Sequence, residues 1–250
     1  MPFTFAHPTA IFPAKYLPKR LYSLTGLVVG SIIPDFEYFI RMNVGSWYSH
    51  SPLGLFWFDL PLGIIVTFIF HSIVRNKLIE NFPDWLYVRF ARFKLFNWIE
   101  AFKRNWPIII ISILVGAASH ILWDDFTHSE RYFVRHILFL RNKINIFSVV
   151  IPMYKILQQV SSFLGACLIL FYIIKMPIEQ KQRSRRSKIF WPLVLTITAM
   201  IVGMRFLGGL VLNQYGNVIV TLFSAFFIGL IISSLILKNT SKNYYFPIEN

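Results

Sequence analysis

The stretch PIIIISILVGAASHILWDDF at residues 107–126 decides the fold of this chain. It contains no Lys, Arg, Asp or Glu before Asp124. At 1.5 Å per residue, about 20 apolar residues in a helix cross a hydrocarbon core of about 30 Å. The stretch therefore predicts a transmembrane helix whose acidic residues lie in its last turn.

Four further stretches are long and apolar enough to span a bilayer. They cover residues 52–74, 158–176, 190–212 and 216–237. A sixth apolar run at residues 24–33 is too short to span, and Pro34 ends it because the residue before a proline disfavours the helical conformation. We expect an all-α polytopic membrane protein with about five transmembrane helices and additional short interfacial helices.

Composition agrees with a membrane protein and argues against a soluble one. Hydrophobic residues make up 56% of the chain and charged residues 14%, against about 25% charged in soluble domains. The net charge of +14 comes from Lys and Arg that lie between the apolar stretches. In such loops these residues set orientation and contact anionic lipid, so we expect membrane lipid and no nucleic acid as partner.

The basic loops also predict an orientation. Residues 75–106 and 177–189 are rich in Lys and Arg and are separated by two spans, so both should face the cytoplasm. The loop NQYGN at residues 213–217 has no positive charge and should lie outside, and the C-terminus with Lys238 and Lys242 should return inside. This orientation leaves the N-terminal region and residues 127–157 outside although both are basic.

Two domains are expected. Residues 1–175 would form a metal-site membrane domain containing the first three spans, and residues 176–250 a C-terminal two-helix hairpin. Residues 75–106 have mixed charge and contain Pro83, Trp85 and Trp98, which predicts an amphipathic helix on the inner membrane surface.

Histidines and aspartates gather at one end of the first two spans. His120 and Asp124 are four residues apart and share a helix face, and His128 follows one turn later. Imidazole and carboxylate are ligands for zinc, iron and manganese. His50 precedes the first span at the same predicted membrane face; Asp35 and His7 come from earlier segments. The alternative is that these residues are plain interfacial polar groups.

Two more ionisable residues lie at membrane depth, where charge is costly and indicates function. Asp59 in the first span and Arg205 in the fourth lie at matching predicted depths, which predicts an intramembrane ion pair. Alternatively each faces water separately, or Asp59 orients a ligating histidine through its free N–H.

Several motifs resemble a known family. They are MPFTFAHP (1–8), GLVVGSIIPDFEYFIR (26–41), SHSPLGLFWFDLPLG (49–63), GAASHILWDDFTH (116–128) and YKILQQVSSFLG (154–165). Together they resemble the uncharacterised bacterial membrane family called domain of unknown function 4184. The resemblance covers roughly residues 1–175 and implies a bacterial inner or plasma membrane location.

That family is in turn distantly similar to membrane-bound metal-dependent hydrolases and to the zinc-dependent phospholipase C and P1 nuclease group. This similarity implies the following metal ligands: His7, Asp35, His50, His120, Asp124 and His128. The soluble enzymes carry a second His-and-Asp pair further along, whereas His136 is the last histidine here. One or two metal ions are therefore expected, with Zn²⁺ as the implied metal.

These observations support a metal-dependent hydrolase with an outward-facing site for a phosphoester or lipid-linked substrate. Asp125 or Glu37 would act as general base. A second hypothesis is a metal or proton transporter that uses the same residues. Such a path needs ionisable groups toward the cytoplasm, but the inner halves of the spans are almost purely apolar apart from His71 near the end of the first. A third is a helix scaffold whose polar residues only brace helix ends.

Overall fold

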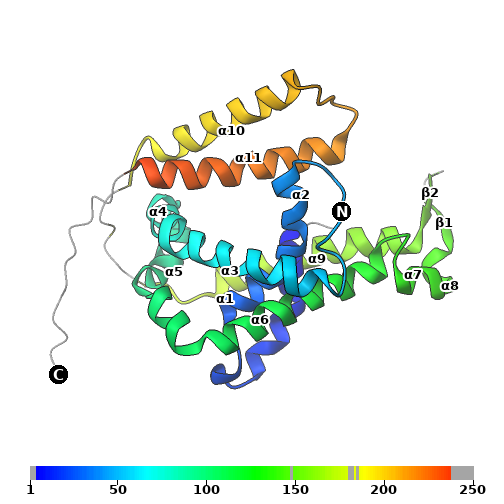
Figure 1. The fold of residues 1–250 in the computed structure, drawn as a ribbon, viewed down its shortest axis with the longest axis horizontal. Coiled ribbons are helices and arrows are strands. Elements are labelled where there is room, and N and C mark those ends of the chain that lie inside the picture. Colours follow the sequence, from blue (N-terminus) through cyan, green and yellow to red (C-terminus); the bar gives the residue numbers. More distant parts are fainter. Residues whose placement is uncertain (1–3, 147–148, 180–182, 184–185, 238–250) are drawn as a thin grey trace. The chain divides into compact units, whose positions relative to one another are not determined.

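The computed structural model describes residues 4–146, 149–179, 183 and 186–237. Five of its helices are long and apolar enough to cross a membrane, at Leu55–Asn81, Trp98–His136, Met153–Lys175, Phe190–Leu207 and Tyr215–Ile236 (Figure 1). The prediction of an all-α polytopic membrane protein is confirmed. Lys238, Lys242 and part of the basic loop 177–189 lie outside the described residues.

The chain forms two compact units. The first contains residues 1–67 and 98–176, and the second contains residues 68–97 and 177–250. Residues 68–97 thus group with the C-terminal hairpin, whereas the sequence placed them in the N-terminal domain. The elements of the first unit are η1 (Thr4–Tyr16), η2 (Lys19–Leu21), α1 (Leu24–Gly30), η3 (Ile33–Asp35), α2 (Phe36–Arg41), η4 (Leu55–Asp59), α3 (Leu60–Ile69, to Thr67), α6 (Trp98–Thr127), α7 (Tyr132–His136), α8 (Leu138–Arg141), β1 (Lys143–Ile146), β2 (Val149–Pro152) and α9 (Met153–Lys175).

Helix α1 is the short apolar helix expected at residues 24–33. The Ser23 side chain caps it by accepting a hydrogen bond from the Gly26 N–H, and the Ser23 N–H donates to Ser112 Oγ on α6 at 2.8 Å. The cap therefore ties the start of α1 to α6.

Glycines let the backbones of α1 and α6 touch. A Cβ atom at Gly30 would lie 2.2 Å from the Ile113 carbonyl oxygen, and one at Gly116 would lie 2.4 Å from the Leu27 carbonyl oxygen. Because no side chain fits between the helices, their mutual register is set by main-chain contact. A buried cluster of Val29, Ile33 and Ala117 continues this interface.

Helix α6 starts before the span that the sequence predicted. Asn105 has non-helical dihedral angles (φ −131°, ψ 26°) and Pro107 follows two residues later, so the helix is kinked where the predicted span begins. Beyond the kink, α6 carries His120 and Asp124 in its last two turns.

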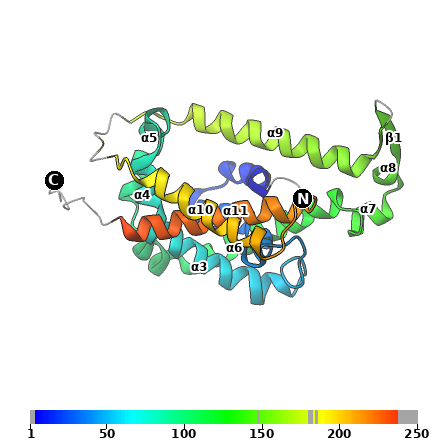
Figure 2. The same ribbon diagram turned by 90° about the horizontal axis from the view of Figure 1, so that it is seen from above.

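Segment η1 packs along α9 and α6, and lies beneath α9 in Figure 2, in dark blue. A Cβ atom at Gly165 of α9 would lie 2.8 Å from the Ala6 Cβ atom, so the contact needs a glycine. This contact holds the N-terminal segment, with His7, inside the first unit.

A short antiparallel hairpin of β1 and β2 joins the α6 end of the unit to α9 (Figure 1). Lys143 pairs with Pro152 and Ile144 with Ile151. The all-α fold expected from the sequence included no strand here. The pattern favours one, because Ile and Val are concentrated on both sides of residues 147–148.

The second unit contains η5 (Phe70–Val74), α4 (Arg75–Asn81), α5 (Asp84–Phe90), η6 (Ala91–Leu95), α10 (Phe190–Leu207) and α11 (Tyr215–Ile236). Helices α10 and α11 lie antiparallel (Figure 1) around a core of Val74, Phe190, Val194 and Leu230. Residues 75–95 form short helices rather than one continuous amphipathic helix.

Candidate metal centre

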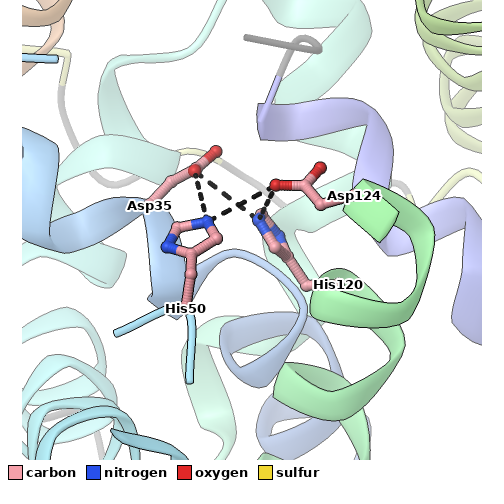
Figure 3. A group of neighbouring side chains, drawn as sticks. All are labelled: Asp35, His50, His120 and Asp124. Carbon is pink, nitrogen blue, oxygen red and sulfur yellow. Dashed lines mark ion pairs between the residues drawn. The ribbon is translucent and has the colours of Figure 1, made fainter. Parts of the chain in front are cut away.

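Four of the six predicted metal ligands converge on one point. Figure 3 shows Asp35 from η3, His50 from the loop before η4, and His120 and Asp124 from α6 pointing toward a common centre. One ligand atom from each of the four lies within 4.8 Å of the others, and all four residues are buried. The group could hold a metal ion.

The donor atoms surround this centre without bonding to one another directly. The Nε2 atom of His50 lies 3.6 Å from Asp35 Oδ1 and 3.4 Å from Asp124 Oδ2. The Nε2 atom of His120 lies 3.5 Å and 3.6 Å from the same two oxygens. Charge-assisted hydrogen bonds are about 2.7–2.9 Å long. The four side chains are therefore spaced more widely than paired ions in direct contact.

Both imidazoles are oriented through their other nitrogen. His120 Nδ1 lies 2.8 Å from the Ser31 carbonyl oxygen, which can only accept, so Nδ1 carries the hydrogen. His50 Nδ1 lies 2.8 Å from Ser49 Oγ. These contacts aim the Nε2 atom of each ring at the centre of the group. In the neutral His120 ring with its hydrogen on Nδ1, the lone pair of Nε2 points at this centre.

Each carboxylate has one oxygen at the centre and one outside it. The outer oxygen of Asp35 accepts a hydrogen bond from the Thr4 hydroxyl. The outer oxygen of Asp124 lies 3.8 Å from His7 Nε2 and 3.6 Å from His128 Nδ1. His7 and His128 therefore lie around the second oxygen of Asp124 and not in the four-residue group.

His7 is deeply buried and its ring stacks on that of His120. Neither ring nitrogen of His7 has a hydrogen-bond partner within the described part of the chain. Burial, reinforced by His120, lowers the pKa of His7 to about 3. The ring is therefore neutral and keeps a lone pair available to a cation.

His128 is held differently. Its Nδ1 atom lies 3.2 Å from the Asp124 carbonyl oxygen and its Nε2 atom lies 3.5 Å from Gln158 Nε2. Helix α6 ends at Thr127, so His128 falls beyond the regular turn that would align it with Asp124. His128 stays a predicted ligand, and it would have to turn its ring to become one.

The charges of the buried group shift the pKa values of its members. Burial alone would lower the pKa of His50, but the carboxylates of Asp124 and Asp35 reverse this and raise it. Burial alone would raise the pKa of Asp35, but His120 and His50 hold it well below its usual value. The carboxylate of Asp35 is thus ionised over the physiological pH range.

Glu37 has a role that the sequence did not indicate. Its buried carboxylate accepts hydrogen bonds from three successive backbone N–H groups, those of Trp47 at 2.7 Å, Tyr48 at 3.0 Å and Ser49 at 2.9 Å. These bonds fold the loop that presents His50, and they lower the pKa of Glu37 against the opposing effect of burial. Glu37 therefore positions His50, one of the predicted metal ligands.

The other predicted residues lie near the group or apart from it. Asp125, beside Asp124, is half-buried. Asp59 is fully buried, and neither of its carboxylate oxygens has a hydrogen-bond partner among the residues described. Asp59 and Arg205 belong to different units, so their ion pair stays a prediction. The sequence did not indicate the residues that orient the predicted ligands, namely Thr4, Ser31 and Ser49. Their hydroxyl and carbonyl contacts produce no regular spacing of residue types that could be recognised in a sequence.

Comparison with known proteins gives a family but no activity. The family described as domain of unknown function (DUF4184) matches residues 1–235, which extends the resemblance beyond residue 175 into both C-terminal spans. No curated protein and no solved structure matches the chain. With the motifs of the metal centre inside the matched region, this chain belongs to the DUF4184 family.

Proposed function

We propose that this protein is a membrane-embedded, metal-dependent hydrolase that acts on a phosphoester or lipid-linked substrate at the outer membrane face. The observation that supports this most is the spacing of the four donor atoms. Two ligands about 2.0–2.2 Å from a tetrahedral zinc ion are about 3.3–3.6 Å apart. The four distances from a histidine Nε2 atom to an aspartate oxygen, 3.4–3.6 Å, fall in this range.

The chemistry of the donors favours a cation in the same way. Two buried carboxylates turn an oxygen toward the same point, and a cation there would offset their repulsion. Two histidines and two carboxylates suit Zn²⁺, with iron or manganese as the other candidates. When bound, such a cation polarises a phosphoryl oxygen and lowers the pKa of water.

The chain's own residues would do the remaining work. Asp35, His50, His120 and Asp124 would hold the cation, and His7 would add a neutral nitrogen beside Asp124. In hydrolysis, water adds its hydroxyl to phosphorus, the P–O bond to the leaving group breaks, and the water proton passes to the leaving oxygen. Asp125 is the better candidate to carry that proton, because the carboxylate of Glu37 is occupied by backbone N–H groups.

Elemental analysis of the purified protein tests the proposal. We expect stoichiometric metal in the wild type, loss of metal in Asp124→Asn, and normal metal content in the matched control His136→Ala, which changes an exposed histidine. Asp125→Asn should keep its metal and lose most hydrolysis of bis(p-nitrophenyl) phosphate. Wild-type protein without metal after growth in zinc-rich medium would refute the proposal.

A further inference from the structure

A groove of about 240 Å³ runs between η1, α6 and α9 in the first unit, and it is separate from the four-residue group. Its lining includes Ala6 and His7 of η1, Trp123 of α6, and Ser161, Gly165 and Leu168 of α9. Pockets that enclose an entire small ligand measure about 300–1,000 Å³. This groove therefore suits one part of a larger molecule.

The walls offer no free hydroxyl hydrogen to a ligand. Thr9 Oγ1 donates to the Ala6 carbonyl oxygen at 2.7 Å. Ser161 and Ser162 both donate to the Gln158 carbonyl oxygen, at 3.1 Å and 2.8 Å. Because these hydroxyls are satisfied by nearby backbone, the groove presents an apolar surface in spite of its three hydroxyl residues.

His7 connects the groove to the four-residue group. His7 lines the groove, its ring stacks on that of ligand His120, and its Nε2 atom faces Asp124 Oδ1. Among the described residues of the lining, it is also the only ionisable one. A molecule in the groove would thus have its apolar part against α9 and its polar end at His7.

Another part of the lining is exposed at the surface of α9. Leu164 and Leu168 line it and are 53% and 46% exposed, on a helix that qualifies as a membrane span. Ser161 and Leu168 lie 8 and 15 residues beyond Met153, the first residue of that helix, or about 12 Å and 22 Å along it. Both residues also lie within residues 158–176, the stretch predicted to span the bilayer, where the surrounding solvent is lipid hydrocarbon.

We infer that the groove holds one linear acyl chain of a membrane phospholipid. The acyl chain enters the groove from the bilayer, so that the phosphoester of the lipid lies beside His7. A linear chain is favoured because Ala6 and Gly165 bring η1 and α9 into close contact along the groove. This inference rests on the proposed function and names its substrate class: a phospholipid rather than a soluble phosphoester.

Photolabelling tests the groove directly. The probe is a phosphatidylglycerol with a diazirine at the end of one acyl chain, reconstituted with the full-length protein in nanodiscs. We expect crosslinks to residues 4–16, which pack against α9, in addition to crosslinks on the outer face of α9. Ser161→Phe, which fills the groove, should lose the crosslink to residues 4–16 several-fold. Ala10→Phe fills it from an exposed position on η1 and should do the same.

The matched control is Cys167→Phe, because Cys167 is exposed on the same helix and absent from the groove. It should keep the full labelling pattern. Labels confined to the outer face of α9, or undiminished in both filled variants, would overturn the inference. Metal content and hydrolysis of bis(p-nitrophenyl) phosphate, measured on the same samples, separate the two proposals. Labelling without metal would refute the hydrolase alone, and metal with hydrolysis but no groove labelling would refute the acyl-chain site alone.

Discussion

The ring of His7 lies nearly parallel to that of His120, with centroids 3.8 Å apart and planes inclined by 21°. The N-terminal segment is thereby stacked directly on a ligand of the proposed metal centre. Because stacking needs only the ring, whereas cation binding needs its nitrogen, the two roles of His7 can be separated by substitution.

We expect His7→Phe to keep the fold and weaken metal binding. Phenylalanine retains the stacked ring but removes the nitrogen that faces Asp124, and loss of such a group costs about 10–100-fold in metal affinity. Zinc titration with a competing chelator measures the affinity, and thermal unfolding checks the fold. His136→Phe is the control at an exposed histidine. Unchanged zinc affinity would reduce His7 to a packing residue.

Glu37→Gln should loosen the loop that carries His50. The amide keeps one acceptor oxygen but turns N–H groups toward backbone donors, and each buried donor left unpaired costs about 1–3 kcal/mol. We expect a lower unfolding temperature together with weaker zinc binding. Glu100→Gln is the control, because Glu100 is exposed and forms an ion pair with Arg104 one turn along the same helix. Normal stability and zinc binding with lost turnover would instead make Glu37 the general base.

Gly116→Ala should separate α1 from α6. Its new Cβ atom would lie 2.4 Å from the Leu27 carbonyl oxygen, and overpacking of this kind costs about 1–3 kcal/mol. The shift also moves the Ser31 carbonyl away from His120, so zinc affinity should fall with stability. Gly203→Ala on α10 is the control, since its Cβ atom would meet nothing within 4 Å in the described residues. Equal effects of both substitutions on stability would contradict the packing argument.

Cysteine labelling tests the predicted orientation. In a Cys167→Ser background, Ser129→Cys should react with a membrane-impermeant maleimide in intact bacterial cells, because residues 127–157 are predicted to face outward. Lys188→Cys should react only after the cells are permeabilised, because residues 177–189 are predicted to face the cytoplasm. The opposite pattern would reverse the orientation and place the metal centre at the cytoplasmic face.

The spans could be predicted because about 20 consecutive apolar residues have no other stable environment. The pairing of His120 with Asp124 was equally predictable, since helical periodicity puts residues four apart on one face. The convergence of Asp35 and His50 on that pair depends on glycine-mediated packing of α1 and on the bonds of Glu37, which involve backbone atoms and leave no pattern of residue types. The sequence placed His128 where the helix should be ending, and α6 does end at Thr127, so the role of His128 as a ligand stays a prediction.

The contact between His120 and the Ser31 carbonyl joins residues 89 positions apart in the chain. A ribosome adds about 5–20 residues per second, so about 4–18 s separate the synthesis of the two partners. During that interval Asp35 and Glu37 have been made but the helix that completes their surroundings has not. The carboxylates cannot enter hydrocarbon uncompensated at that stage. Insertion of this protein must therefore hold its first 50 residues at the membrane surface until the second span arrives.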